Sequence, residues 1–283
     1  MAIASTGRVA AKSDWARASR RHLKHVAIFA VLVVPALYFA PIPTAILLAC
    51  GVIDVGRHRK LTLSLVEEYF TGRGVLTWFL SPLNLATDLF ARRLARPVRL
   101  EDLPADCRAE VEACVAAFLE NRDPLKAAIQ SHVAGAERVM LTFKWFDKVL
   151  PAPLRIPAFE QPFRHVKTIA VSTFGARKKT SWHFGPQRLT WRVLRTLDPI
   201  DSDEVFIAVD DHVHRWREQP LFIFDDTMFH QSVNNIDVER YCLFMDIVRP
   251  NHFQAGFEAA ITAMSVFAGS FRGLFYRNWS FLR

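Results

Sequence analysis

The chain has 283 residues, 51% of them hydrophobic, which is enough to bury a sizeable core in one large or two modest domains. Its formal net charge of +8 and pI near 9.6 suit either nucleic acid or an anionic membrane surface as partner. The four cysteines show no CxxC spacing and are too few for a disulfide scaffold, which fits a reducing compartment.

A basic leader precedes an apolar segment, residues 26–53, that contains no charged residue. The leader holds six basic residues against a single acid, Asp14, and a second basic group follows at 57–60. The segment exceeds the roughly 20 residues that a helix needs to cross a bilayer, and basic flanks suit anionic headgroups. We therefore predict that residues 1–60 are a leader and membrane segment. Because the charge gathers here and forms no aromatic-interleaved groove, we expect no nucleic-acid partner.

The topology of this segment stays open at the level of sequence. Pro35, Pro41 and Pro43 break or kink a helix, and both flanks are basic. A single span and a re-entrant hairpin with both ends on the cytoplasmic side are therefore both compatible with the pattern. A buried core helix is less favoured because of the length without charge, and a cleaved signal peptide because of the long leader.

Residues 61–135 have the apolar spacing of amphipathic helices, and we predict a helical subdomain there. Apolar residues recur at three- and four-residue steps at Leu63, Val66, Tyr69 and Phe70, and again at Val111, Cys114, Val115 and Phe118.

Residues 136–250 change to short runs rich in Val, Ile, Phe and Trp between polar turns. Examples are 168–173, 205–209, 221–224 and 241–248. This texture predicts strands of a β-barrel or jelly roll. The expected fold class is therefore α+β, with a jelly-roll core, an N-terminal helical subdomain and a membrane anchor.

Residues 251–283 are predicted to form a C-terminal amphipathic helix. Aromatic residues recur every four positions at Phe267, Phe271, Phe275 and Trp279, with Arg272, Arg277 and Arg283 interleaved. Such a helix either packs on the β domain or lies in the membrane interface, and the sequence leaves both open.

Two histidines in the β region stand in distinctive surroundings, Trp182-His183-Phe184-Gly185-Pro186 and Phe224-Asp225-Asp226-Thr227-Met228-Phe229-His230. Neutral imidazole is a good ligand for iron(II), and two histidines on neighbouring strands leave positions open for other ligands. Two arginines follow at short intervals: Arg192 nine residues after His183, and Arg240 ten residues after His230.

This layout, over roughly residues 143–250, resembles the aspartyl/asparaginyl β-hydroxylase family, which includes lipid A 2-hydroxylases and ornithine-lipid hydroxylases. The resemblance implies a double-stranded β-helix that uses iron(II) and 2-oxoglutarate, with ascorbate as reductant. Carried over by position, His183 and His230 correspond to the metal ligands. Arg192, Arg240 and Ser172 correspond to co-substrate residues, and a guanidinium fork does pair well with a carboxylate.

Two positions depart from common forms of the family. Position 185 is Gly185, so the usual His-x-Asp carboxylate ligand is missing. The family members that act on protein aspartyl residues share that gap, with an aspartate that holds a water, and Asp226 occupies the matching catalytic position. Position 194 is Leu194, where the family commonly has a histidine. Gly185 therefore leaves the third iron ligand undefined by the sequence, and Leu194 bears on the co-substrate contacts that the resemblance implies at that position.

His212 and His214 form an HxH pair that resembles a metal motif by spacing. The flanking residues instead favour the two sides of a hairpin, with these alternate residues facing solvent.

The function that follows is a membrane-attached dioxygenase that hydroxylates a lipid acyl chain near its carbonyl, of the lipid A or ornithine-lipid type. The expected location is the inner (cytoplasmic) membrane, with the catalytic domain facing the cytoplasm. Two alternatives are a peptide aspartyl/asparaginyl β-hydroxylase, favoured by Gly185, and a non-catalytic membrane scaffold with a jelly-roll domain. Iron-dependent turnover of 2-oxoglutarate separates the scaffold from both enzymes.

Overall fold

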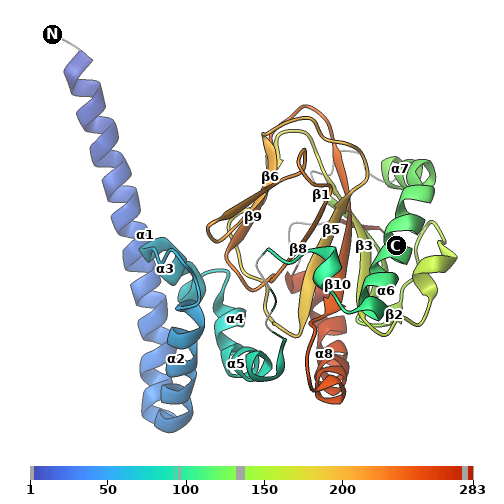
Figure 1. Cartoon of the computed structure of the whole chain (residues 1–283). Helices are drawn as coiled ribbons and strands as arrows, with labels where there is room; N and C mark the ends of the chain where they lie inside the picture. The colour runs from blue at the N-terminus through green and yellow to red at the C-terminus, as the bar shows by residue number, and fades with distance from the viewer. Residues whose placement is uncertain (1–2, 93, 95–96, 132–137, 276–279, 283) are drawn as a thin grey trace. The chain divides into compact units, whose positions relative to one another are not determined.

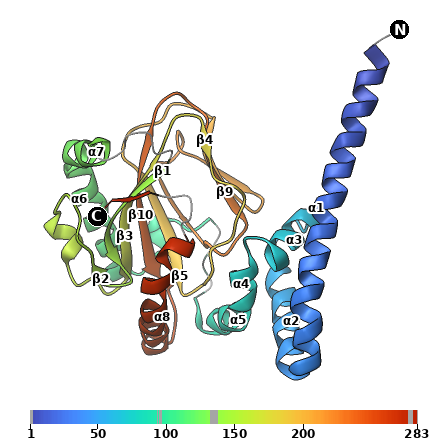
Figure 2. The same cartoon turned by 180° about the vertical axis from the view of Figure 1, so that it is seen from behind.

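The computed structural model describes residues 3–92, 94, 97–131, 138–275 and 280–282, and for 3–18, 21, 267–275 and 280–282 the backbone alone. The chain forms two compact units, whose elements can be followed in Figures 1 and 2. The helical unit comprises residues 1–85 together with the short segment 183–186. The β unit comprises residues 86–182 and 187–283.

The helical unit begins with a hairpin of two helices, α1 (Ile3–Phe39) and α2 (Pro41–Val55). Pro35 lies inside α1 without ending it, whereas Pro41 is the first residue of α2, where the missing N–H costs least. Near the turn, the Thr44 hydroxyl donates to the carbonyls of Ala36 (3.0 Å) and Ala40 (2.7 Å). The apolar segment 26–53 is thus divided between two helices.

The end of α1 leaves a large apolar surface exposed. Residues 22–39 are the single stretch in the described part of the chain that is long and apolar enough to cross a membrane by length and composition, and only 6% of the stretch is buried. Val31 is 73% exposed, and Tyr38 and Phe39 are 81% exposed. Contiguous exposed apolar surface of this kind marks an interaction surface in a folded protein.

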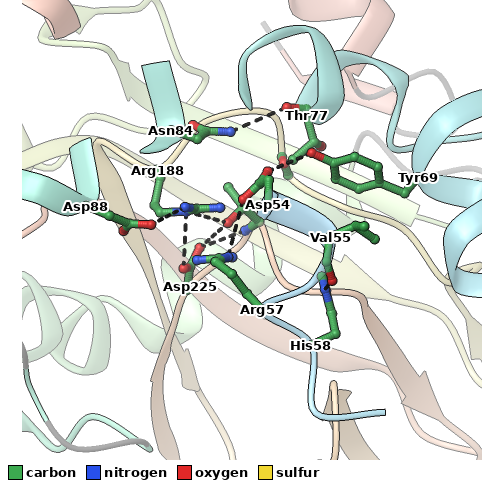
Figure 3. A network of polar contacts seen from close by, with 12 residues as sticks. Asp54, Val55, Arg57, His58, Tyr69, Thr77, Asn84, Asp88, Arg188 and Asp225 are labelled. Carbon is green, nitrogen blue, oxygen red and sulfur yellow. Dashed lines mark hydrogen bonds and ion pairs between the residues drawn. The ribbon is translucent and has the colours of Figure 1, made fainter. Parts of the chain in front are cut away.

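Two further helices complete the helical unit, α3 (Leu63–Thr71) and α4 (Val75–Phe79). The Thr62 side chain caps α3 by accepting from the Leu65 N–H at 3.2 Å. Tyr69 on α3 donates to the buried Asp54 carboxylate of α2 at 2.7 Å, and Arg57 lies 3.3 Å from the same carboxylate (Figure 3). These contacts fix α3 against the end of α2.

The β unit contains helices around two sheets. The helix α5 (Ser81–Phe90) begins in the helical unit and ends in the β unit. The other helices are α6 (Ala105–Glu120), α7 (Arg122–Gln130), α8 (Gln254–Phe275) and the short 3-10 helices Leu100–Asp102 and Pro157–Glu160. The strands are β1 (Arg138–Trp145), β2 (Lys148–Val149), β3 (Val166–Phe174), β4 (Lys178–Lys179), β5 (Thr190–Thr196), β6 (Val205–Val209), β7 (His212–Arg215), β8 (Leu221–Phe224), β9 (His230–Asn234), β10 (Arg240–Val248) and β11 (Ser280–Leu282).

The strand order is that of a jelly roll. The larger sheet runs β11-β1-β3-β10-β5-β8, with β2 paired to β1, and the smaller sheet runs β4-β9-β6-β7. The chain passes from one sheet to the other between β3 and β4, and the core strands β3 to β10 divide four and four between the two sheets. The expected α+β class with a jelly-roll core is confirmed.

The larger sheet separates two apolar clusters. Alternate residues of β10, such as Leu243 and Met245, join a cluster that includes Val111 and Phe118 of α6. Their neighbours Cys242 and Phe244 join a second cluster with residues of β6 and β8. Because the side chains of a strand alternate between faces, one face of β10 packs on helices and the other lines the space between the two sheets.

The C-terminal segment is only partly the helix that its aromatic spacing predicts. Helix α8 ends at Phe275, and Ser280–Leu282 form strand β11, which pairs in parallel with β1. The helical prediction is therefore wrong for 280–282, because sheet hydrogen bonds to β1 override local spacing. The side chains of Phe267, Phe271 and Phe275 and all of Trp279 lie outside the described residues.

One carboxylate ties α6 to the larger sheet. Glu110 accepts three backbone N–H groups at the start of β3, from Arg164 (2.8 Å), His165 (2.7 Å) and Val166 (3.0 Å). Hydrogen bonds to a charged acceptor are stronger than neutral ones, and a buried N–H left without a partner is costly. The helical spacing of α6 gives no hint of this contact.

We predict that Glu110→Ala lowers the free energy of unfolding of the detergent-solubilised chain by about 1–3 kcal/mol, because it leaves these N–H groups without their acceptor. Chemical denaturation followed by tryptophan fluorescence measures the effect. Glu112→Ala, at an exposed position of the same helix, is the matched control and should change the value by less than about 0.5 kcal/mol. Equal effects of the two variants would contradict the prediction.

The HxH pair lies on the hairpin that its flanking sequence predicts, but its two members differ. Asp210 adopts a positive φ of 54° in the turn, and β6 pairs with β7 from Val209↔His212 to Phe206↔Arg215. His212 is exposed, whereas His214 is 6% exposed. The expectation that both face solvent is wrong for His214, which stacks on Phe222 with ring centroids 4.3 Å apart.

The burial of His214 predicts a pH dependence of stability. Burial lowers the pKa of His214 to about 4, so the unfolded chain takes up this proton at a higher pH than the folded chain. Stability from the neutral ring is present above the unfolded pKa of about 6.5 and is lost as the pH falls toward 4. His214→Phe keeps an aromatic ring against Phe222 and removes the titration.

We expect the unfolding free energy of His214→Phe to fall less than that of the wild type between pH 7 and pH 4.5, by on the order of 1–2 kcal/mol. Denaturant titrations at the two pH values measure this difference, whatever the absolute stability of the variant. Val238→Phe, at a position 65% exposed, adds a phenylalanine without removing a titratable group and serves as control. Identical pH slopes in His214→Phe and the wild type would rule out the buried neutral histidine.

Candidate functional site

Five of the six predicted site residues lie in the β unit. Ser172 on β3, Arg192 on β5 and Arg240 on β10 alternate with residues of the helix-facing cluster, so they point between the two sheets. His230 is the first residue of β9, and Asp226 lies four residues before it in the turn after β8. The topology thus brings together residues from four strands on the inner faces of the jelly roll.

His230 is held as a neutral ring with a defined tautomer. It is 4% exposed, and its Nδ1 lies 2.8 Å from the Met228 carbonyl oxygen. A carbonyl can only accept, so Nδ1 carries the proton and Nε2 carries the lone pair. Burial is the largest cause that lowers the pKa of His230 to about 4. Histidines that bind metals are oriented in this way, with the second ring nitrogen bound to a carbonyl or carboxylate.

The lone pair of His230 faces a second acceptor. Its Nε2 lies 3.4 Å from Asp226 Oδ1, a buried oxygen with no hydrogen-bond donor in the described part of the chain. Two atoms with lone pairs repel each other at this separation unless a cation or a hydrogen-bond donor lies between them. This pair therefore fits half of a site for a divalent metal.

Arg192 crosses the interior between two carboxylates. Its Nη2 lies 3.1 Å from Asp226 Oδ2, and its Nε donates to Asp246 Oδ1 at 2.7 Å. The guanidinium also lies over the Phe244 ring, 3.7 Å from the centroid. Burial is the largest cause that raises the pKa of Asp246, and the positive charge of Arg192 partly opposes this rise. Arg192 is thus paired within the protein, and it orients Asp226.

Arg240 is a buried cation that is only partly paired. It is 4% exposed, and its Nη2 donates to the Ser232 hydroxyl at 2.7 Å. Its Nε and Nη1 are buried with no acceptor among the described residues, and the guanidinium lies 4.6 Å from the Phe174 ring and 5.4 Å from the Trp216 ring. Burial lowers the pKa of Arg240, yet a guanidinium stays charged at neutral pH. A buried cation with free donors fits an anionic ligand.

Ser172 lies near the same face but uses its hydroxyl within the sheet. Its Oγ donates to the Cys242 carbonyl at 3.2 Å, and Cys242 is its register partner on β10. The hydroxyl oxygen retains acceptor capacity, and the position is 3% exposed. The structure therefore places Ser172 on the inner face, two residues along β3 from Phe174, the register partner of Arg240.

His183 belongs to the helical unit, in the segment 183–186. That segment is held by its own unit: Thr77 donates to the Gly185 carbonyl at 2.8 Å, and Asn84 donates to the Pro186 carbonyl at 3.3 Å. The Phe184 ring packs against Tyr69, with centroids 5.4 Å apart. Thr77 and Asn84 of the helical unit thus fix the backbone beside His183.

A buried network that the sequence did not suggest supports the turn before His230. Arg188 is fully buried and pairs with Asp88 of α5; its Nε lies 3.2 Å from the Thr227 hydroxyl and 3.7 Å from Asp225 (Figure 3). The Thr227 hydroxyl and N–H both donate to Asp225, at 2.6 and 3.0 Å. Asp225 thus shapes the turn, while its neighbour Asp226 faces the interior. In the sequence, the adjacent aspartates 225 and 226 were the one feature that pointed to this network.

The described residues contain no group of three or more His, Cys, Asp and Glu side chains arranged to hold a metal. Within the β unit, His230 Nε2 and Asp226 Oδ1 are the pair of described atoms placed to bind a metal as ligands. His212 and His214 supply no such group either.

Comparison with known proteins gives a match over the β unit. The sequence profile of the aspartyl/asparaginyl β-hydroxylase family matches residues 148–250. The ornithine lipid ester-linked acyl 2-hydroxylase of Rhizobium tropici is 36% identical over 84 residues, which are 29% of this chain and 30% of that protein. The chain thus matches less than a third of the length of this relative.

Solved structures of β proteins are also similar, at low scores. A 2OG-Fe(II) oxygenase family protein from Burkholderia pseudomallei has a TM-score of 0.33 and 11% identity, covering 47% of this chain and 81% of that one. A cupin superfamily protein from Desulfitobacterium hafniense has a TM-score of 0.26 and 12% identity, covering 43% and 87%.

The family resemblance drawn from the two histidine motifs is confirmed by the profile match and by the identity to the acyl 2-hydroxylase. Residues 148–250 of this chain are thus similar in sequence to the aspartyl/asparaginyl β-hydroxylase family.

Proposed function

We propose that this protein is a hydroxylase dependent on iron(II) and 2-oxoglutarate that acts on the acyl chain of a membrane lipid. The observation that carries the proposal is Arg240, a buried cation with two unsatisfied donors on the inner face of the same jelly roll that presents His230. A protein keeps such an uncompensated charge in its interior at a high cost in stability, which an anionic ligand would offset.

Arg240 is the residue that binds the distal carboxylate of 2-oxoglutarate in this proposal. Its Nε and Nη1 provide two donors for a carboxylate, and Ser232 already fixes the third nitrogen. The buried Trp216 Nε1, which has no acceptor among the described residues, is a further donor beside this guanidinium. Arg192 has the more limited role of orienting Asp226, because it is already paired with two carboxylates.

His230, with Asp226 beside it, fits one side of the iron site, and we assign His183 as the second histidine by its family motif. Dioxygen activated at iron(II) would supply the oxidising power for hydroxylation of an unactivated carbon, with 2-oxoglutarate oxidised to succinate and carbon dioxide in the same reaction and ascorbate keeping the metal reduced. The protein contributes three things. The carbonyl of Met228 holds the tautomer of His230, Arg192 holds the Asp226 carboxylate, and the apolar cluster around Phe224 and Phe244 excludes water.

The lipid substrate is supported by the relative and by the helical unit. The Rhizobium tropici relative is an acyl 2-hydroxylase of a lipid, and α1 carries an exposed apolar stretch at 22–39. A membrane-attached enzyme meets its lipid substrate at the bilayer surface. Basic residues on both sides of the apolar segment favour the cytoplasmic face of the inner membrane for the catalytic domain.

A peptide aspartyl or asparaginyl side chain is the second candidate substrate. It is favoured by Gly185, which leaves no carboxylate two residues after His183. The two candidates differ in the substrate that raises succinate formation.

The first test is succinate formation by detergent-purified protein with iron(II), ascorbate and 2-oxoglutarate, together with either bacterial lipid extract or an aspartate-containing peptide. We expect succinate to rise with lipid. His230→Ala should bind at least tenfold less iron and form no succinate above background, because it removes the ligand nitrogen. His252→Ala, at an exposed position of the same unit, should behave as the wild type. If the protein binds no iron and forms no succinate with either substrate, the hydroxylase proposal is wrong and the non-catalytic scaffold is favoured.

We predict that Arg240→Gln raises the KM for 2-oxoglutarate at least about 100-fold, because charge-assisted hydrogen bonds to the carboxylate are lost. Arg240→Lys should fall between Gln and the wild type, since it keeps the charge with a different donor geometry. Calorimetric titration with 2-oxoglutarate reports the same loss without turnover. Arg217→Gln, at an exposed ion pair, is the matched control and should keep wild-type affinity. Unchanged affinity in Arg240→Gln would remove this residue from the co-substrate site.

A further inference from the structure

The end of the hairpin formed by α1 and α2 is apolar and open to its surroundings. We call residues 31–46 the hairpin tip. The tip contains no charged residue, and its two buried residues are Val33 and Thr44. Five of its large apolar side chains are at least 63% exposed, namely Val31, Val34, Tyr38, Phe39 and Ile42. A helix that is apolar all round needs an apolar environment, so the tip requires an occupant for its exposed surface.

The turn of the hairpin pairs its polar groups within the chain. The Ala40 N–H donates to the Ala36 carbonyl at 2.8 Å, and the Ala40 carbonyl accepts from the N–H of Thr44 at 3.1 Å and from its hydroxyl at 2.7 Å. Pro41 and Pro43 have no N–H, so two of the first three residues of α2 bring no donor that needs a cap. Hydrocarbon tolerates only polar groups that are satisfied within the chain. The turn therefore suits burial in hydrocarbon.

Positive charge gathers at both ends of the hairpin. Arg20 and Lys24 on α1 are exposed, and so are Arg59 and Lys60 just after α2. Asp54 is the single acid of the hairpin and its flanks, and it is buried. An apolar tip with a basic base fits a membrane with anionic headgroups. A second copy of this chain fits less well, because it would bring the same positive charge to the contact.

One short helix, α3, contacts both ends of the hairpin. On the α1 side, His25 Nδ1 lies 2.6 Å from the Thr71 hydroxyl of α3, and on the α2 side Asp54 accepts from Tyr69 of α3 at 2.7 Å. The two views show α2 running back beside α1 (Figures 1 and 2). Because α3 also carries two adjacent glutamates, it does not lie in hydrocarbon. Both ends of the hairpin therefore lie on the same side of any membrane that the tip enters.

The apolar part of each helix is too short to cross a bilayer. At about 1.5 Å per residue, residues 26–39 rise about 21 Å and the 15 residues of α2 rise about 22 Å. The hydrocarbon core of a bilayer is about 30 Å thick. The stretch 22–39 reaches the length of a span only by including Lys24 and two histidines. A single span would thus place a charged residue and two polar rings at the edge of the hydrocarbon.

Aromatic contacts mark where the tip begins. Phe29 of α1 stacks on Trp78 of α4 with ring centroids 6.0 Å apart, and the Trp78 indole N–H donates to the Leu47 carbonyl of α2 at 3.2 Å. Beyond these contacts, residues 31–39 rise about 13 Å as a helix. One leaflet supplies about half of the roughly 30 Å hydrocarbon thickness. The length of the tip therefore matches a single leaflet.

We propose that the hairpin tip inserts into one leaflet of an anionic membrane from the cytoplasmic side, with both ends of the hairpin on that side. The occupant of the exposed tip surface is the hydrocarbon of that leaflet, and the four exposed basic residues at the base meet its headgroups. The inference decides for the re-entrant hairpin against the single span. It rests on the membrane attachment in the proposed function and not on the chemistry of the β unit.

Spin labels on the full chain measure the depth of the hairpin in vesicles of phosphatidylethanolamine and phosphatidylglycerol. Cys50→Ala first removes the one cysteine that is not buried. Single cysteines then replace Val26, Val31, Tyr38 and Ile42, which are all exposed. Collision of each label with oxygen, which gathers in hydrocarbon, is compared with collision with a water-soluble nickel chelate present on both sides of the vesicle.

We expect the labels at Tyr38 and Ile42 to be the deepest, with chelate collision at least fivefold lower than at Val26. Lys148→Cys, at an exposed position of the β unit, is the aqueous control. Circular dichroism of each variant checks that the helices are retained. The measurement needs no iron, 2-oxoglutarate or substrate.

Three results would overturn the proposal. A single span of residues 22–39 gives the opposite order, with Val31 deepest and Tyr38 open to the chelate. Equal chelate collision at all hairpin sites and at Lys148 would mean that the tip does not enter the membrane. Spectral broadening at Tyr38 that disappears on dilution with unlabelled chain would replace the lipid with a second copy of this chain.

Arginine substitutions give a second measurement that uses no label. Phe39→Arg places a charge at the deepest point of an inserted tip, where a charged side chain is costly. We expect it to raise the fraction of protein that alkaline carbonate extracts from membranes at least fivefold. Val52→Arg, at a position 62% exposed near the base of the hairpin, is the matched control and should stay close to the wild type. Equal extraction of the two variants would contradict insertion of the tip.

Failure of this inference is distinguishable from failure of the proposed function. Protein that forms succinate with lipid but shows the depth order of a single span keeps the hydroxylase and loses the inserted hairpin. Protein that shows the hairpin depth order but neither binds iron nor forms succinate keeps the hairpin and loses the proposed chemistry.

Discussion

Charge buried between two β-sheets is the constraint on which the site depends. An arginine inside an apolar interior must be paired, or its desolvation destabilises the fold. Arg188 meets that condition with Asp88, Asp225 and Thr227, and Arg192 meets it with Asp226 and Asp246. Arg240 meets it only in part, through Ser232 and two aromatic rings. The satisfied arginines fix the turn and the carboxylate positions, whereas Arg240 keeps two donors that our proposal assigns to 2-oxoglutarate.

The same two-residue alternation that builds the core also builds the site. On β10, one face supplies Leu243 and Met245 to the packing against α6, and the opposite face supplies Arg240 and Asp246 to the interior. A shift of one residue in register would exchange these faces. The site is therefore fixed by the apolar packing of the larger sheet on its helices, and the Glu110 contact to the start of β3 reinforces that packing.

In the proposed function, the residues assigned to the iron site lie in or next to short segments between strands. The turn 225–229 is shaped by Asp225 and delivers Asp226 and His230, and the segment 183–186 is held by Thr77 and Asn84 of the helical unit. Loops on a rigid scaffold commonly carry function. The helical unit thus has two roles in the proposal: it carries the exposed apolar stretch of α1, and it fixes the backbone beside His183.

The sequence by itself determined the jelly roll, the helices before it and the resemblance of residues 148–250 to the β-hydroxylase family, because strand patterns and motif spacing are local. It also suggested six site residues, namely Ser172, His183, Arg192, Asp226, His230 and Arg240, whose roles remain predictions. Only the tertiary structure decided that Arg192 is paired, that His214 is buried and that 280–282 form a strand. These features depend on which distant strands become neighbours, and residue spacing carries no information on that.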